Sequence, residues 1–134
     1  MTIPTHKSRD TTAMIGYGAV LMLWLSVENT NLVVVSVLGA GLSAMLLRLM
    51  VLRLYGGKTF SLWAPGMFFF GLLVGFGAVW CTVGLMVFKN AWHAHAYPDF
   101  PATIVTGITQ RWLSWSLAGG LLGGAAALFR LAGR

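Results

Sequence analysis

The chain has 134 residues, of which 57% are hydrophobic and only 9% are charged, and its mean hydropathy is +0.79. Soluble domains usually carry about 25% charged residues, so this chain has too few to cover a water-facing surface. The composition therefore excludes most soluble enzymes, nucleotide-binding folds and DNA-binding modules, and it favours an integral membrane protein.

The formal net charge of +6 does not indicate a nucleic-acid partner. Its nine basic residues are scattered near the ends of apolar runs and form neither a stripe nor a recognition-helix pattern. The single cysteine, Cys81, cannot form a disulfide within the chain, and we interpret it as a thiol in an apolar setting.

After a polar tail of residues 1–11, four apolar runs follow, each near the roughly 20 residues that a helix needs to cross a bilayer. The runs cover residues 12–28, 32–53, 62–88 and 112–131. They are continuously apolar and do not alternate with period two, which favours helices over barrel strands. We predict an all-α polytopic protein with one transmembrane domain, residues 12–134, whose four spanning helices form two antiparallel hairpins.

The first connection is the short polar segment Glu28, Asn29, Thr30 and Asn31, which predicts a tight turn. The second contains Gly56 and Gly57, which give the backbone the freedom to reverse direction.

The third connection, residues 89–111, is the longest, and Pro98 and Pro101 argue against a straight helix through it. Residues 102–109 are moderately apolar but too short to span a bilayer. We interpret them as an interfacial or re-entrant segment, in the form of a short helix on the membrane surface.

The basic residues predict the orientation, because they concentrate on the cytoplasmic side of membrane proteins. Four spans put both termini on one side, where seven basic residues would lie against two on the other. The seven are Lys7, Arg9, Arg48, Arg53, Lys58, Arg130 and Arg134, and the two are Lys89 and Arg111. We predict cytoplasmic termini, with the bacterial inner membrane as the simplest location.

An internal repeat is a further hypothesis. Residues 16–20 (GYGAV) match residues 75–79 (GFGAV), in the first and third runs. Two helices per unit would give parallel repeats related by an axis along the membrane normal. Glycine-rich apolar segments also match by chance, so a coincidental match remains the alternative.

Glycines spaced four residues apart predict close helix packing, because helices without side chains at the contact can approach until their backbones touch. Three such pairs occur in the third and fourth runs. They are Gly71 with Gly75, Gly119 with Gly123, and Gly120 with Gly124. The face that they contact can belong to this chain, to a second copy or to another protein.

A candidate polar cluster lies on the predicted outer side. It consists of Glu28, His93, His95 and Asp99. Two histidines one residue apart with a carboxylate nearby are a partial set of metal ligands, and a histidine can also ligate a tetrapyrrole. Two histidines do not complete a zinc site, however, and the composition is also ordinary for a membrane interface. We therefore assign no catalytic, cofactor-binding or metal-binding residue.

Three functions are compatible with this sequence. The preferred one is an accessory or assembly subunit that binds a larger membrane complex, or further copies of itself, through glycine-rich helix faces. The second is a small homodimeric carrier or channel for an apolar or amphipathic solute. The third is a metal- or tetrapyrrole-binding membrane protein that uses His93 and His95. No enzyme motif is recognisable, and no ionisable residue falls near mid-membrane, as an ion-coupled transporter would require.

Overall fold

The computed structural model describes residues 7–28, 30–55, 64–93 and 97–133, and it contains helices and no strand within these ranges. The helices are α1 (Lys7–Ser26), α2 (Leu32–Tyr55), α3 (Ala64–His93), α4 (Ala102–Thr109) and α5 (Trp112–Ala132). The predicted all-α class is confirmed.

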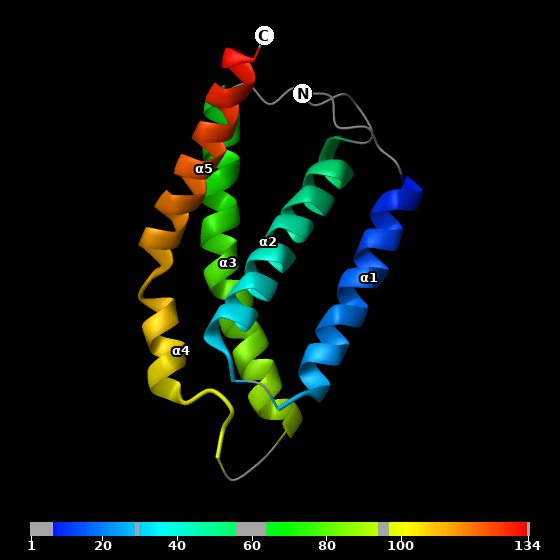
Figure 1. Cartoon of the computed structure of the whole chain (residues 1–134), viewed down its shortest axis with the longest axis vertical. Helices are drawn as coiled ribbons and strands as arrows, with labels where there is room; N and C mark the ends of the chain where they lie inside the picture. The colour runs from blue at the N-terminus through cyan, green and yellow to red at the C-terminus, as the bar shows by residue number, and fades with distance from the viewer. Residues whose placement is uncertain (1–6, 29, 56–63, 94–96, 134) are drawn as a thin grey trace.

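The chain passes four times along the long axis of the molecule (Figure 1). Helices α1, α2 and α3 alternate in direction, and α4 and α5 together make the fourth pass. Helix α3 is central: α5 packs along it on one side and α2 on the other, while α4 contacts its C-terminal half. Helix α1 lies at the edge, next to α2.

Among the described residues, three helices are long and apolar enough to cross a membrane. They are the segments Leu32–Leu54, Pro65–His93 and Trp112–Ala132 of α2, α3 and α5. Helix α1 has 20 residues, but its first turn contains Lys7, Arg9 and Asp10 and it is the least apolar of the long helices. Three spans are therefore supported by length and composition where the sequence predicts four.

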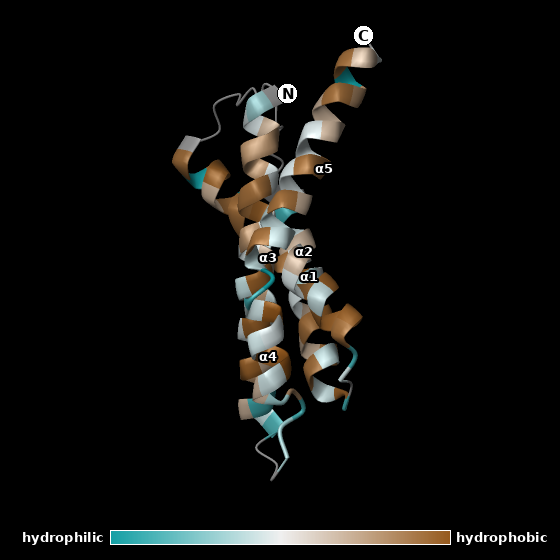
Figure 2. Ribbon diagram, turned by 90° about the vertical axis from the view of Figure 1, so that its left-hand side faces the viewer, coloured by the Kyte–Doolittle hydropathy of each residue, from teal (hydrophilic) through white to brown (hydrophobic). Residues whose placement is uncertain are grey.

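Large apolar side chains cover much of the outside of the bundle, and the brown segments in Figure 2 mark hydrophobic residues along the helices. Ile15, Leu122 and Phe129 are 69%, 73% and 79% exposed. A water-soluble monomer rarely exposes apolar surface on this scale, so the distribution suits a lipid environment. The buried core is small by comparison and lies around Val35, Val79 and Met86.

Helix α3 continues five residues beyond its predicted end at residue 88. Lys89, Asn90 and His93 are therefore helical, and the predicted loop of residues 89–111 begins only after His93. The helix continues because Lys89 and Asn90 bond to neighbouring segments, and because the next proline in the chain is Pro98.

A short helix, α4, forms at residues 102–109, where the sequence predicts an interfacial or re-entrant segment. It runs along the bundle axis almost in line with α5, and not across the axis like a helix lying flat on a surface (Figures 1 and 2). Packing explains this direction, because Ile108 is buried and Ile104 and Val105 lie against the core cluster.

Glycines bring α3 and α5 into backbone contact. A Cβ atom added to Gly71 or Gly75 would collide with the carbonyl oxygen of Gly119 or Trp115. One added to Gly119 or Gly123 would collide with a carbonyl oxygen of α3. The two glycine pairs therefore contact each other within this chain, and they are not available to a partner.

The third predicted pair faces side chains instead. Gly120 lies against Leu72 and Phe68, whereas Gly124 makes only an ordinary contact with Phe68. Glycines also allow α2 to approach α3: Gly39 lies against Thr82.

Candidate functional site

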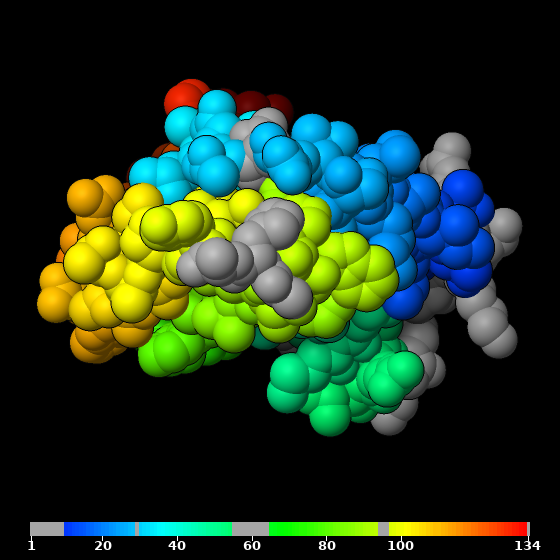
Figure 3. Space-filling model, turned by 90° about the horizontal axis from the view of Figure 1, so that it is seen from below, coloured from blue at the N-terminus to red at the C-terminus, as the bar shows by residue number. Residues whose placement is uncertain are grey.

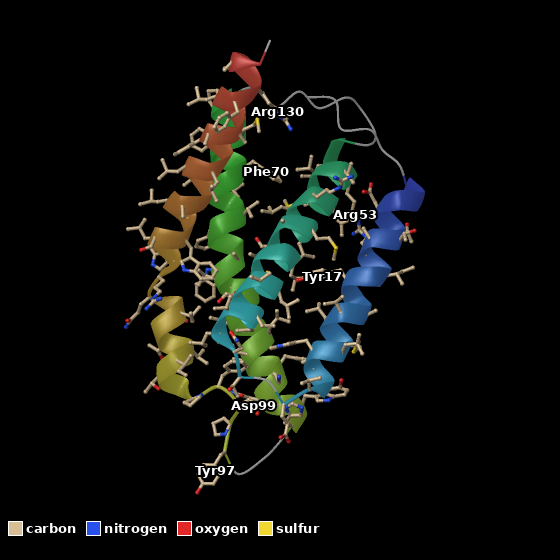
Figure 4. All side chains as sticks on the ribbon, viewed as in Figure 1. Tyr17, Arg53, Phe70, Tyr97, Asp99 and Arg130 are labelled. Atoms are coloured by element: carbon tan, nitrogen blue, oxygen red, sulfur yellow. The ribbon has the colours of Figure 1, made fainter. Side chains whose placement is uncertain are left out.

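Polar side chains gather where α1 and α3 end. We call this group the polar cap and define it as Trp24, Val27, Lys89, Asn90, His93, Asp99 and Phe100. Figure 3 views this end of the molecule, where the end of α1, the start of α2, the end of α3 and residues 97–101 come together. Figure 4 shows Asp99 beside the end of α3, with Tyr97 pointing away from the bundle.

Lys89 is the centre of the polar cap and is completely buried. Its Nζ donates hydrogen bonds to the carbonyl oxygens of Val27, at 2.8 Å, and of Trp24, at 3.5 Å. It also lies 4.4 Å from the centre of the Trp24 ring, close enough for a cation–π interaction. The last carbonyl groups of a helix lack partners within it and carry a partial negative charge. Lys89 of α3 therefore caps the C-terminal end of α1.

Two carboxylates help to balance the buried ammonium group. The charges of Asp99 and Glu28 both interact with that of Lys89. Asp99 is largely buried, with a side chain 10% exposed, whereas Glu28 is exposed. A buried charge without such compensation would be strongly destabilising, and these acids offset part of the cost of burying Lys89.

His93 and Asp99 form a direct pair in the polar cap. The distance between His93 Nδ1 and Asp99 Oδ2 is 2.5 Å, and the two side chains are 13% and 10% exposed. An ionised carboxylate only accepts hydrogen bonds, so in the pair with ionised Asp99 the donor is His93 Nδ1. This bond joins the last residue of α3 to the segment that leads into α4.

Asn90 fixes the same segment through its backbone. Its Nδ2 donates to the carbonyl oxygen of Phe100, and its Oδ1 accepts from the Phe100 amide, both at 2.8 Å. One side chain thus satisfies both backbone groups of a residue outside regular structure. The Phe100 ring is consequently held in the core, where it is 1% exposed.

The structure places three of the four predicted cluster residues at this end. His93 and Asp99 are in contact, and Glu28 is nearby at the surface. His95 lies outside the described residues. The predicted cluster did not include Lys89, Asn90 or Trp24, because the lysine resembled a charge that determines topology and the tryptophan resembled an interfacial anchor. One signal for this site was present in the sequence. Lys89, Asn90 and His93 lie close together at the end of a predicted helix.

The polar cap offers few ligands for a metal ion. Among the residues that the structure describes, no three His, Cys, Asp or Glu side chains come together. His93 and Asp99 supply two ligands, whereas structural zinc sites use four and catalytic sites three. The bonds of the cap instead connect three segments: the end of α1, the end of α3 and residues 97–101.

Comparisons with protein-family models, with curated proteins and with solved structures find no match to this chain.

Proposed function

We propose that the protein is an integral membrane protein of four spans that acts as an accessory or assembly subunit of a larger membrane complex. Three apolar helices and the exposed apolar surface support membrane insertion. Helix α1 is proposed as the fourth span because it runs antiparallel to α2 (Figure 1) and carries exposed apolar residues such as Ile15 and Leu23.

The proposed orientation has both termini in the cytoplasm of a bacterial cell. Helix α1 begins and α5 ends at the same end of the bundle (Figure 1). Arg48, Arg53 and Arg130 lie toward that end, and Lys89 lies toward the other, whereas Arg111 lies between α4 and α5, about midway along the bundle. The excess of basic residues near the termini supports a cytoplasmic location for them.

The partner-binding surface proposed from the structure differs from the one that the sequence suggests. Gly71, Gly75, Gly119 and Gly123 are occupied by contacts within the chain. Helix α1, by contrast, is attached through side chains: Tyr17 donates a hydrogen bond to the carbonyl oxygen of Leu38, and Asp10 pairs with Arg48 at 2.6 Å.

One observation carries the proposal. A Cβ atom added to Gly16 of α1, which shares a helix face with Ala13, would meet no atom within 4 Å in the described part of the chain. A hollow of ≈ 400 Å³ also opens between α1 and α2, where Ala13, Met14 and Ala44 line it. Small residues on an open helix face are the usual contact for another transmembrane helix, so α1 is the proposed docking helix for a partner.

Affinity purification in a mild detergent tests this proposal. We expect a partner to co-purify with the wild type, and to be lost when Gly16→Leu fills the open face of α1. Gly84→Leu is the matched control, because Gly84 of α3 is equally open. A wild-type protein that migrates as a lone monomer without a partner would refute the subunit function. Release of the protein by a carbonate wash would refute membrane insertion itself.

A further inference from the structure

Arg111 lies about midway along the bundle. A Cβ atom added to Gly75 of α3 would collide with the carbonyl oxygen of Trp115 of α5, so these two residues lie at the same height. Because the two helices are antiparallel (Figure 1), four residues back from Trp115 correspond to four residues forward from Gly75, and Arg111 is level with Val79. Val79 is at the middle of the 30 residues of α3. Helix α4 continues the fourth pass beyond Arg111.

In the four-span arrangement proposed above, this height is close to the middle of the membrane. Arg111 is exposed on the bundle there. The sequence predicts a loop at this position and no ionisable residue near mid-membrane, and in this arrangement that prediction is wrong because α4 makes Arg111 part of the fourth pass. A charged side chain at such a depth is costly, and it ordinarily pairs with another group or lines a water-filled cavity.

This chain supplies no acidic side chain to Arg111. The sequence has three acidic residues, all within the described ranges, and each interacts with another basic residue. They are Asp10 with Arg48, Glu28 with Lys89, and Asp99 with His93. The hollow beside Arg111 contains one other polar side chain, that of Ser36. The guanidinium therefore lacks a compensating charge within the described part of the chain.

A second copy of the chain does not supply the acid either. Two copies inserted in one membrane, parallel or antiparallel, both keep Arg111 at mid-depth and their acids near the two faces. Asp10 is in the first turn of α1, at the end where the termini lie. Glu28 and Asp99 lie toward the other end, where Asp99 bonds to His93. From the level of Arg111 to His93, α3 rises about 21 Å at ~1.5 Å per residue, which is farther than two side chains extend together.

We propose that a transmembrane helix of a different protein packs beside Arg111 and pairs an Asp or Glu side chain with it near mid-membrane. The proposal gives the chemistry of the partner in the accessory-subunit function, and it rests on that function. Ionisable groups inside membranes commonly pair with one another. Arginine suits such a pair because its planar guanidinium donates two parallel hydrogen bonds to one carboxylate.

The surface next to Arg111 can receive a helix. Two adjoining hollows that share Ala40 and Trp115 lie between α2 and α5, with volumes of ≈ 450 and ≈ 310 Å³, and Arg111 lines the larger one. Small residues line much of the other, and small residues allow close approach of a helix in a membrane. They are Ala40, Gly75, Ala78, Ala118 and Gly119. A partner helix here would leave the open face of α1 uncovered, so the two contacts can be tested separately.

A lipid headgroup and a free anion suit this position less well than a carboxylate on a helix. Lipid phosphates lie at the membrane faces, about 15 Å from the middle of a hydrocarbon core that is about 30 Å thick. A free anion would have to enter an apolar hollow whose polar side chains are those of Arg111 and Ser36. The apolar residues of a transmembrane helix, by contrast, carry an acidic side chain to this depth.

Binding of transmembrane peptides to the full chain in lipid vesicles tests the charge pair. The probe is a leucine-rich peptide of about 20 residues with one Glu at its centre, and the control peptide has Gln there. Energy transfer between labelled protein and labelled peptide measures binding. We expect the wild type to bind the Glu peptide about tenfold more tightly, because hydrogen bonds between charged groups are the stronger ones. Arg111→Gln should remove this preference. Arg53→Gln should keep it, since Arg53 is exposed in the last turn of α2.

Disulfide cross-linking tests the position of the helix. Ala118 and Leu117 are both exposed on α5 at nearly the same height, but only Ala118 lines the hollows. The Glu peptide carries a cysteine two helical turns on either side of its Glu, and the protein carries Cys81→Ala. We expect Ala118→Cys to cross-link to this peptide and Leu117→Cys not to. Equal cross-linking at both positions would place the helix elsewhere and overturn the packing surface.

Three results would overturn the charge pair itself. The first is equal binding of the Glu and Gln peptides by the wild type. The second is a preference for the Glu peptide that persists in Arg111→Gln or is equally lost in Arg53→Gln, which would indicate an effect of net charge. The third is a dimer of the pure chain that is lost in Arg111→Gln, which would place a second copy on this surface.

Failure of this contact can be distinguished from failure of the subunit function. A partner that co-purifies equally with the wild type and with Arg111→Gln, but is lost in Gly16→Leu, would refute the charge pair and leave the accessory-subunit function intact. A wild-type protein without any partner would refute the function on which the charge pair rests.

Discussion

The α3–α5 pair and the α1–α2 pair each contain one of two matching glycine segments but are held together differently. In the matching segments of residues 16–20 and 75–79, Gly75 lies against the backbone of α5, whereas Gly16 faces open space. The difference lies in the opposite helix. Gly71 and Gly75 of α3 meet Gly119 and Gly123 of α5, so the backbones of the two helices can approach each other. A small residue on one helix alone does not produce such a close contact.

The two pairs should therefore differ in stability. Close packing along α3 and α5 adds many small van der Waals contacts. Helix α1 buries Trp24 and Leu25 in the core near its end. Along the rest of its length it is held by separate polar contacts, which join Asp10 to Arg48, Tyr17 to the Leu38 carbonyl, and Lys89 to the last carbonyls of α1. Hydrogen bonds between helices in a membrane contribute only about 0.6 kcal/mol each on average. We infer that α1 separates from the bundle before α5 does.

The largest effect is expected from a side chain placed in the α3–α5 contact. Gly75→Leu puts four carbon atoms where the backbone of Trp115 lies, so the helices must move apart. Overpacking costs typically about 1–3 kcal/mol and occasionally more, and a clash with backbone atoms should put this variant at the upper end. Unfolding of the full chain by SDS in mixed micelles measures this loss.

Gly84→Leu is the control for that variant, because it makes the same change on the same helix without a neighbour within 4 Å. It should be neutral or slightly stabilising, since leucine favours the helix over glycine by up to about 1 kcal/mol. Equal losses of stability in both variants would show that the α3–α5 contact is not the reason.

Removal of the buried ammonium group should have the second largest effect, and it should be local to α1. Lys89→Met keeps most of the side-chain volume but leaves the carbonyls of Trp24 and Val27 without their donor. Hydrogen bonds to charged groups contribute about 1.5–3 kcal/mol. Hydrogen exchange at the last turn of α1 should accelerate by roughly tenfold or more, at ~1.4 kcal/mol per factor of ten.

Arg53→Met serves as the control for charge, because Arg53 is an exposed cation at the end of α2. If the last turn of α1 exchanged at the wild-type rate in Lys89→Met, the capping role of Lys89 would be wrong.

The comparison also shows what could be predicted from the sequence. Long apolar runs are sufficient to predict the helices, since a chain in lipid must satisfy its backbone within the helix. The spacing of Gly71 with Gly75 and of Gly119 with Gly123 predicts close packing. It does not identify the opposite face, because that depends on the rotation of each helix about its own axis.

The polar cap was less predictable, for a different reason. Lys89 is buried only because α1 ends beside it and two carboxylates lie nearby, and those neighbours are distant in the sequence. A basic residue at the end of an apolar run is ordinarily exposed and contributes to topology. Asn90 likewise acts on Phe100 across a segment that contains Pro98, and local pattern gives no sign of that contact.

A smaller effect is expected for the contact between α1 and α2. Tyr17→Phe removes only the hydroxyl that donates to the Leu38 carbonyl, so the loss should be about 0.6 kcal/mol. Tyr97→Phe removes the same atom from a side chain that is 86% exposed, and it should change nothing. The free energies of unfolding of the two variants, compared in the same micelles, measure the difference. Equal values would mean that the Tyr17 hydroxyl does not stabilise α1.

The smallest effect is expected for the ion pair at the start of α1. Arg48 is about half exposed and Asp10 is 19% exposed, and pairs in such settings contribute roughly 0–1 kcal/mol. Arg48→Gln removes this pair alone. Asp10→Asn also removes an acidic residue from the first turn of α1, where it interacts favourably with the helix dipole by about 0.3–1 kcal/mol.

The two variants can be separated by salt. The ion pair and the dipole contact are both screened, over a Debye length of about 10 Å at 0.1 M and about 3 Å at 1 M. We expect Asp10→Asn to be the less stable variant at low salt, and both to approach the wild type in unfolding free energy as the salt concentration rises. A loss of unfolding free energy above about 2 kcal/mol that persists at 1 M salt would instead mean that the ion pair is shielded from water. Helix α1 would then be held at its first turn as firmly as at its last.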